Sequence, residues 1–177
     1  MAVKNSDLKQ DLGGLIESLK SLDDLQRHLL QSRWLDQVLW MEGKAASAQK
    51  RYNALRLVAI IGSVIVPALV GLKIGEQGVC PWIQWTTFFL SLIVAISIAV
   101  EELFHYGERW RHYRRTVECL KIEGWQFFQL AGTYQQSQTH SQAFPDFAAQ
   151  VEKICRQEVD VFITEVSQEK KEKKETQ

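Results

Sequence analysis

Two long apolar runs, almost free of charge, divide an otherwise polar chain. The first, "LVAIIGSVIVPALVGL", covers residues 57–72, and the second, "WIQWTTFFLSLIVAISIAV", covers residues 82–100. Each comes close to the roughly 20 residues that a helix needs to cross a bilayer. Arg56 and Lys73 border the first run, and their long side chains can reach the headgroups from inside the span. The pattern predicts transmembrane helices at 57–74 and 82–100, joined by an external loop at 75–81.

The alternative for these runs is a pair of core helices in a soluble bundle. Such helices keep a charged or polar face toward water, whereas neither run carries a charge on any face. Only nine residues, "KIGEQGVCP", separate the two runs, which favours a transmembrane hairpin. Trp82 and Trp85 would lie at one membrane interface and Tyr52 and Tyr106 at the other, as in an aromatic belt.

Basic residues near the ends of the spans predict the orientation of the hairpin. The loop side has one, Lys73, whereas both outer flanks are rich in lysine and arginine. The positive-inside rule therefore predicts a multi-pass membrane protein with both termini in the cytoplasm. The flanking basic residues are Lys44, Lys50, Arg51, Arg56, Arg109, Arg111, Arg114 and Arg115.

Apolar residues also recur with alternating three- and four-residue spacing outside both spans, while charged residues lie between them. Such spacing is typical of helices that pack along a coiled-coil-like seam. It enters both spans without a Gly-Pro break, so we expect each helix to run through the membrane boundary uninterrupted. The predicted stalk helices cover 21–56 and 101–134. Their packing residues are Trp34, Val38, Met41, Tyr52, Tyr106, Trp110, Tyr113, Val117, Leu120 and Phe127.

The remaining segments complete an all-α prediction. Residues 1–20 form a short amphipathic segment, and Ser21 with Asp24 resembles a capping box that opens the first stalk helix. A C-terminal helix is expected at 144–168, followed by a disordered tail at 169–177. The predicted fold is thus an all-α membrane protein: a two-transmembrane helical hairpin that continues into a long cytoplasmic antiparallel stalk, with an additional C-terminal helix.

Composition narrows the possible functions. Lys+Arg and Asp+Glu both number 21, which gives no reason to expect a nucleic-acid partner. Three scattered cysteines suit neither a disulfide framework nor a zinc site. Glu102 and His105 spell E-x-x-H, but a di-iron bundle needs a second copy and further glutamates. We find no enzyme motif and predict no catalytic residue, metal or cofactor.

A polar stripe on the second run offers a candidate site. It consists of Gln84, Thr87 and Ser91, continued by the small residue Ala95. Such groups can hold a neighbouring helix or line an ion path, and a path needs several copies because two spans cannot enclose one. The adjacent Glu101 and Glu102 would then ring its inner mouth and attract cations; the alternative for them is a solvated helix face.

These observations predict a homo-oligomeric ion channel or pore in a lipid bilayer. The alternative is a non-conducting membrane-anchored scaffold or signalling protein whose stalk binds a cytosolic protein. The aromatic residues Trp34, Trp40 and Trp125 of the stalk favour this alternative.

Two segments also carry a family resemblance. "QSRWLDQVLWMEGKAASAQKRYNALRLVAIIGSVIVPAL" enters the first span, and "ERWRHYRRTVECLKIEGWQF" leaves the second. Over about residues 25–165 the chain resembles uncharacterised bacterial two-transmembrane proteins of the SLATT kind and a related family of unknown function. The resemblance implies a bacterial inner-membrane protein acting as a pore-forming or signalling effector, and it brings no catalytic residues.

The general plan also resembles the pore subunit of the mitochondrial calcium uniporter. That family has an acidic motif at the entry to its second span, where this chain reads "CPWIQW". A calcium filter of that type is therefore not expected.

Overall fold

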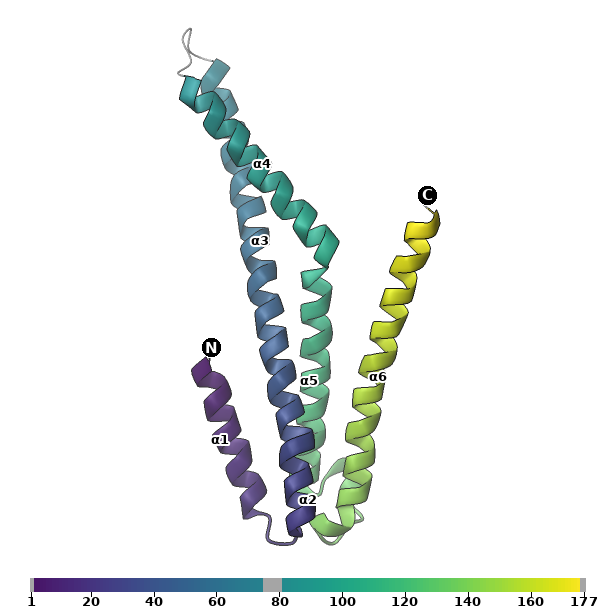
Figure 1. Ribbon diagram of the computed structural model, residues 1–177. Helices are drawn as coiled ribbons and strands as arrows, with labels where there is room; N and C mark the ends of the chain where they lie inside the picture. The colour runs from purple at the N-terminus through teal and green to yellow at the C-terminus, as the bar shows by residue number, and fades with distance from the viewer. Residues whose placement is uncertain (1, 75–80, 176–177) are drawn as a thin grey trace. The chain divides into compact units, whose positions relative to one another are not determined.

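A computed structural model describes residues 2–74 and 81–175, and confirms the all-α prediction for them. The residues form two compact units (Figure 1). The bundle unit comprises residues 1–43 and 113–177, and the hairpin unit comprises residues 44–112. In chain order the elements are α1 Ala2–Ser18, α2 Asp24–Leu29, the π-helical η1 Leu30–Leu35, α3 Asp36–Ile74, α4 Pro81–Phe104, α5 Tyr106–Gln129, the 3-10 helix η2 Gly132–Tyr134 and α6 His140–Glu175.

The bundle unit has one hydrophobic core to which several helices contribute. All the predicted packing residues of this unit except Tyr113 are buried there, together with residues of α1 and α6. Trp34, at 2% exposure, is the largest of the fully buried side chains. The core comprises Leu12, Ile16, Leu22, Leu30, Trp34, Leu35, Val38, Met41, Val117, Leu120, Phe127, Tyr134, Ala143, Phe144, Phe147 and Val151.

The helix predicted from residue 21 is capped two residues later than expected. Asp23, rather than Ser21, is the N-cap, and its carboxylate accepts from the backbone N–H of Gln26 at 2.6 Å. The Gln26 side chain accepts from the N–H of Asp23 in return, which completes a capping box. The helix then widens into the π-turn η1. This turn brings the side chains of Leu30, Trp34 and Leu35 all into the core.

Each of the two long helices was predicted to continue without a break from its span into the stalk. For the first helix this agrees with α3, which is continuous from Asp36 to Ile74 and includes Pro67. The second prediction, an uninterrupted helix, is wrong: the left-handed residue His105 (φ 47°) separates α4 from α5 (Figure 1). The N–H of His105 still donates to the carbonyl of Glu101, and its own carbonyl accepts from the N–H of Arg109. A left-handed residue is a common helix end, and the apolar spacing does not reveal it because that spacing continues past it.

This backbone conformation makes a testable prediction. His105→Gly is expected to stabilise the protein by about 0.5–1 kcal/mol, because glycine adopts positive φ without the steric cost that a Cβ brings. The measurement is thermal unfolding of the full chain in mild detergent, followed by helical circular dichroism. His105→Val is the control and should destabilise, since a β-branched residue fits this region poorly. Equal destabilisation by glycine and valine would show that position 105 is not left-handed.

The segment after α5 also differs from the prediction of one helix to residue 134. The helix ends at Gln129, because Leu130 (φ 48°) and Gly132 (φ 61°) turn the chain. A Cβ on Gly132 would also lie 2.8 Å from the side-chain oxygen of Gln126. The short η2 then buries Tyr134.

The last helix is longer than predicted at both ends. It begins at His140 rather than near 144, and Thr139 accepts from the N–H of Gln142 in its first turn. The helix extends to Glu175, so the predicted disordered tail at 169–177 is helical as far as that residue, and 176–177 lie outside the described residues. Residues 75–80 of the predicted external loop also lie outside them, and Pro81 begins α4.

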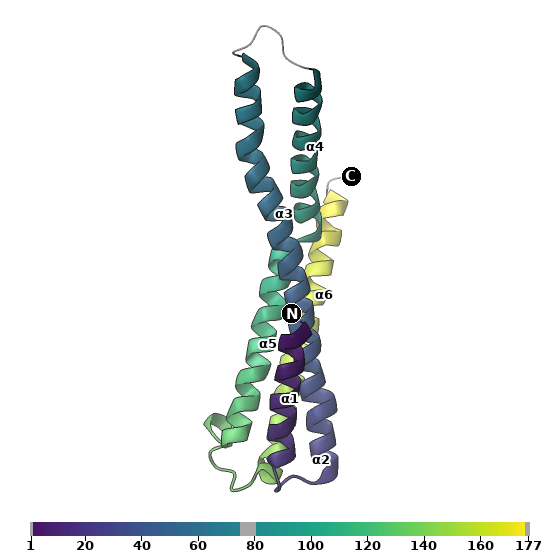
Figure 2. The same ribbon diagram turned by 90° about the vertical axis from the view of Figure 1, so that its left-hand side faces the viewer.

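In the hairpin unit, α4 runs alongside the later part of α3 (Figure 2). The helices touch at Gly62, where an added Cβ would overlap the side chain of Val94. Both helices are long and apolar enough to cross a membrane, and only 6% of the residues in the most apolar window of each are buried. The low burial differs from that of core helices in a soluble bundle. The chain has two candidate membrane spans.

Candidate functional site

The outer surface of α4 is the first candidate site, because the predicted polar stripe lies there in part. Gln84, Ser91 and Ala95 are exposed, whereas Thr87 is only half-exposed. Thr87 lies two helical turns before Val94, on the face that meets α3. The structure thus divides the stripe: Thr87 belongs to the contact between the two helices, and the other three residues face outward.

The hydroxyl groups of α4 donate hydrogen bonds within their own helix. Thr87 donates to the carbonyl of Ile83, and Ser91 donates to that of Thr87, both at 2.8 Å. Ser97, which the sequence did not single out, does the same with Ile93 and is buried. The sequence carries no signal for it, because Val94, three residues earlier, is recognised as a contact residue only once the two helices are paired. The oxygens of these hydroxyls can still accept further hydrogen bonds.

The two glutamates at the end of α4 differ in exposure. Glu101 is half-exposed, Glu102 is exposed, and they lie in the last turn of the helix. Their neighbour His105 approaches Glu108 at 3.7 Å. Since His105 breaks the helix, Glu102 and His105 do not share the unbroken helical face that an E-x-x-H metal pair requires.

The same end of the hairpin unit contains a cluster of aromatic rings and arginines. Tyr52 stacks on Trp110 with ring centroids 6.4 Å apart, and an added Cβ on Gly107 would lie 2.8 Å from the Tyr52 ring. Arg56 donates to the Tyr52 hydroxyl. Arg51 lies 5.7 Å above the ring of Tyr106. The predicted packing residues Tyr52, Tyr106 and Trp110, and Tyr113 of the bundle unit, are all half-buried.

In the bundle unit, Trp34 joins α5 and α6 to the π-turn. Its indole N–H donates to the carbonyl of Leu120 at 2.9 Å, and its ring packs edge-on against Phe128 and Phe147. Gly124 lies directly against the ring. Trp34 therefore cannot form part of an exposed surface for a partner, which corrects that part of the scaffold prediction. Trp40 and Trp125 are exposed at 52% and 47%.

Ion pairs surround this core. Glu42 accepts from Arg114 at 3.0 Å and from Lys121 at 2.6 Å, and its side chain is only 13% exposed. Arg33 donates two hydrogen bonds to Glu152, at 2.6 and 2.8 Å. The hydrogen bonds from Arg33 hold the pKa of the Glu152 carboxyl below its usual value. Two-point pairing of this kind fixes geometry as well as charge.

Two other groups of the bundle unit have pKa values raised by burial. Tyr134 is buried and its hydroxyl donates to Glu123, so burial first and the carboxylate second raise its pKa. Burial also raises the pKa of the Cys155 thiol. Both groups are therefore protonated at neutral pH, and neither is an activated nucleophile.

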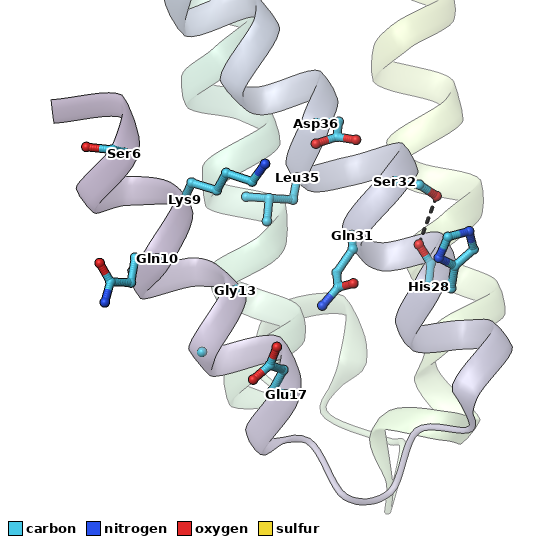
Figure 3. Close-up of a pocket in the computed structure, with 11 residues that line it drawn as sticks. Ser6, Lys9, Gln10, Gly13, Glu17, His28, Gln31, Ser32, Leu35 and Asp36 are labelled. Atoms are coloured by element: carbon cyan, nitrogen blue, oxygen red, sulfur yellow. Dashed lines mark hydrogen bonds between the residues drawn. The ribbon is translucent and has the colours of Figure 1, made fainter. Parts of the chain in front are cut away.

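An open polar groove of about 740 Å³ lies between α1 and the α2–η1–α3 segment (Figure 3). Lys9 and Gln31 extend into it from opposite sides, while Gly13 leaves space on α1. Charges of both signs line it, so it has no strong preference for one ionic ligand. Sequence reasoning missed the groove because its formation depends on how α1 packs. It is lined by Ser6, Lys9, Gln10, Gly13, Gly14, Glu17, His28, Gln31, Ser32, Leu35 and Asp36.

Comparison with known protein families gives a match for most of the chain. Residues 36–142 match the family described as "Protein of unknown function (DUF4231)". Neither the curated proteins nor the solved structures include a match to the chain. The matched range covers all of α3, α4, α5 and η2, and the start of α6. Because this range is more than half of the chain, the protein belongs to the DUF4231 family of unknown function.

Proposed function

We propose that this protein is a homo-oligomeric ion channel, in which α4 of each copy faces a central path and the bundle unit lies in the cytoplasm. The observation that carries the proposal is the outward position of Gln84 and Ser91 on a helix whose surface is mainly apolar. The likeness to bacterial two-transmembrane proteins of the SLATT kind, including a bacterial inner-membrane location, belongs to the same proposal.

Gln84 lies at the loop-side interface, between Trp82 and Trp85, and Ser91 lies two helical turns deeper in the candidate span. The face of α4 that carries them is not covered by α3, and polar groups within a membrane favour contact with water or with a neighbouring helix. Several copies around an axis would turn the stripe inward, toward water and toward one another. The exposed apolar residues of α3, including Leu57, Ile60 and Val64, would then face lipid.

In this arrangement the residues of the stripe have different roles. Gln84 and Ser91 contact the path, and Ala95 leaves it wide near its inner end. Thr87 contributes to the α3–α4 contact rather than to the lining. Glu101 and Glu102 supply the negative charge at the inner mouth that favours cations.

The acidic ring gives the second prediction. Replacing both Glu101 and Glu102 by glutamine is expected to reduce cation-over-anion selectivity severalfold, because the charges that concentrate cations at the mouth are removed. The measurement is the reversal potential of the reconstituted full chain in planar bilayers under a KCl gradient. Glu108→Gln is the control, since it removes a charge beyond the break at His105. Unchanged selectivity in the double variant would exclude Glu101 and Glu102 from the mouth.

The subunit count of the purified protein in mild detergent tests the assembly itself. Native mass spectrometry should show one closed assembly of about five or more copies, which leaves room for a central path. A monomer or simple dimer would contradict the channel. That result would favour the second candidate, a membrane-anchored scaffold, for which the exposed Trp40, Ile122 and Trp125 of the bundle unit would be the binding residues.

A further inference from the structure

We propose that the arginine–aromatic cluster at the end of the hairpin unit binds the phosphate of an anionic phospholipid headgroup. The cluster consists of Arg51, Tyr52 and Arg56 of α3 with Tyr106 and Trp110 of α5. The inference rests on the proposed membrane location, but not on conduction or on the number of subunits.

The two arginines of the cluster retain hydrogen-bond donors for an anion. Arg56 lies 5.6 Å from the Tyr52 ring centroid and donates to its hydroxyl, while Arg51 lies over the ring of Tyr106. Within the described part of the chain, neither guanidinium is in ion-pair range of a carboxylate. Both side chains are exposed. Arginine has five N–H donors, so most of them remain available to an anion.

Ring contacts hold the aromatic residues of the cluster in place. Tyr52 is packed between Gly107 and the parallel ring of Trp110, and Tyr106 stacks on Phe104 with centroids 5.4 Å apart. Aromatic faces hold guanidinium groups in place without neutralising them. Arg51 and Arg56 are thus positioned cations with directed donors, and a phosphate matches such forked donors in two-point geometry.

The cluster lies next to the exposed apolar surface of the first candidate span. Arg56 immediately precedes the exposed Leu57, and Arg51 lies five residues earlier, about 7.5 Å along the helix. That separation spans the depth of a headgroup region. Basic residues outnumber acidic residues at this end of the unit by six to three. The basic residues are Lys44, Lys50, Arg51, Arg56, Arg109 and Arg111, and the acidic residues are Glu101, Glu102 and Glu108.

The test compares lipid retention by the full chain in mild detergent, using native mass spectrometry with added phosphatidylglycerol or phosphatidylcholine. The unaltered protein should retain phosphatidylglycerol in preference to phosphatidylcholine. Arg51→Gln with Arg56→Gln should weaken phosphatidylglycerol binding by about thirtyfold, from roughly 1 kcal/mol for each basic residue at a lipid surface. Arg109→Gln with Arg111→Gln removes the same charge from exposed residues outside the cluster, and should weaken binding much less.

Three results would overturn the proposal. Equal losses in the two double variants would indicate diffuse attraction between a basic surface and anionic lipid. Displacement of the lipid by millimolar inorganic phosphate would indicate a site for free phosphate. Equal retention of both lipids by the unaltered protein would show that there is no headgroup preference.

A separate measurement distinguishes these failures from failure of the proposed membrane location. Flotation of the reconstituted protein with vesicles that survives alkaline carbonate shows membrane insertion. Insertion without headgroup preference rejects the lipid site alone. Extraction of the protein by alkaline carbonate would reject the proposed membrane location, and the lipid site with it.

Discussion

Trp34→Ala is expected to destabilise the protein by about 3–5 kcal/mol, the range for removing a buried tryptophan from a packed core. The side chain is 2% exposed and joins α5 and α6 through its ring contacts. Its loss would leave a cavity, and would also leave the carbonyl of Leu120 without the indole donor. For a chain of this size the melting temperature should fall by roughly 10 °C, as measured by helical circular dichroism in mild detergent.

Two further variants separate the causes. Trp34→Phe keeps an aromatic ring but removes the N–H, and should cost about 1–2 kcal/mol. Trp40→Ala is the matched control, because this side chain is half-exposed on α3. Its loss should cost less than about 1 kcal/mol. If Trp40→Ala were as harmful as Trp34→Ala, Trp34 would not be the centre of the core.

Gly124→Leu is the second large prediction, with an expected loss of about 3 kcal/mol or more from overpacking. A Cβ at this position would lie 2.8 Å from Cε2 of Trp34 and closer still to Cζ2. Neither side can yield easily, because Gly124 lies within α5 and the Trp34 ring is fixed by its hydrogen bond. The measurement is again the free energy of unfolding of the full chain in detergent.

Gly13→Ala is the control for glycine replacement within a helix. Nothing lies within 4 Å of its added Cβ, so the better helix propensity of alanine should stabilise α1 by up to about 1 kcal/mol.

The double variant Trp34→Ala with Gly124→Leu should be more stable than the sum of the single losses predicts, because the leucine can occupy the space that the indole leaves. Strict additivity would show that the two residues do not touch.

Local patterns allowed much of the fold to be predicted from sequence. The two charge-free runs lie in α3 and α4, since absence of charge needs no tertiary information. The alternating three- and four-residue spacing likewise predicted Trp34, Val117 and Leu120 as packing residues, and all three are buried in the core. The break at His105 was missed because neither glycine nor proline marks it, and the apolar spacing continues across it.

The candidate site was predictable to a smaller extent. The stripe of polar residues on α4 can be read from the sequence, but which of them meet α3 depends on the register of the two helices. The contact between Gly62 and Val94 sets that register, and neither residue looks special before the helices are paired. The arginine–aromatic cluster depends likewise on α3 lying beside the start of α5, so the positive-inside rule could locate its charges but not their partners.

The left-handed residue between α4 and α5 also has a mechanical consequence. Within a regular helix, the dihedral angles of each residue are restrained by the hydrogen bonds of the turns on either side, so a twist at one end is carried to the other. At His105 the regular series of helical dihedral angles is interrupted, so rotation about the two torsion angles of this one residue turns α4 relative to α5. Within the hairpin unit the two candidate spans therefore differ: α3 continues past its span without a left-handed residue, whereas α4 ends in a joint at His105.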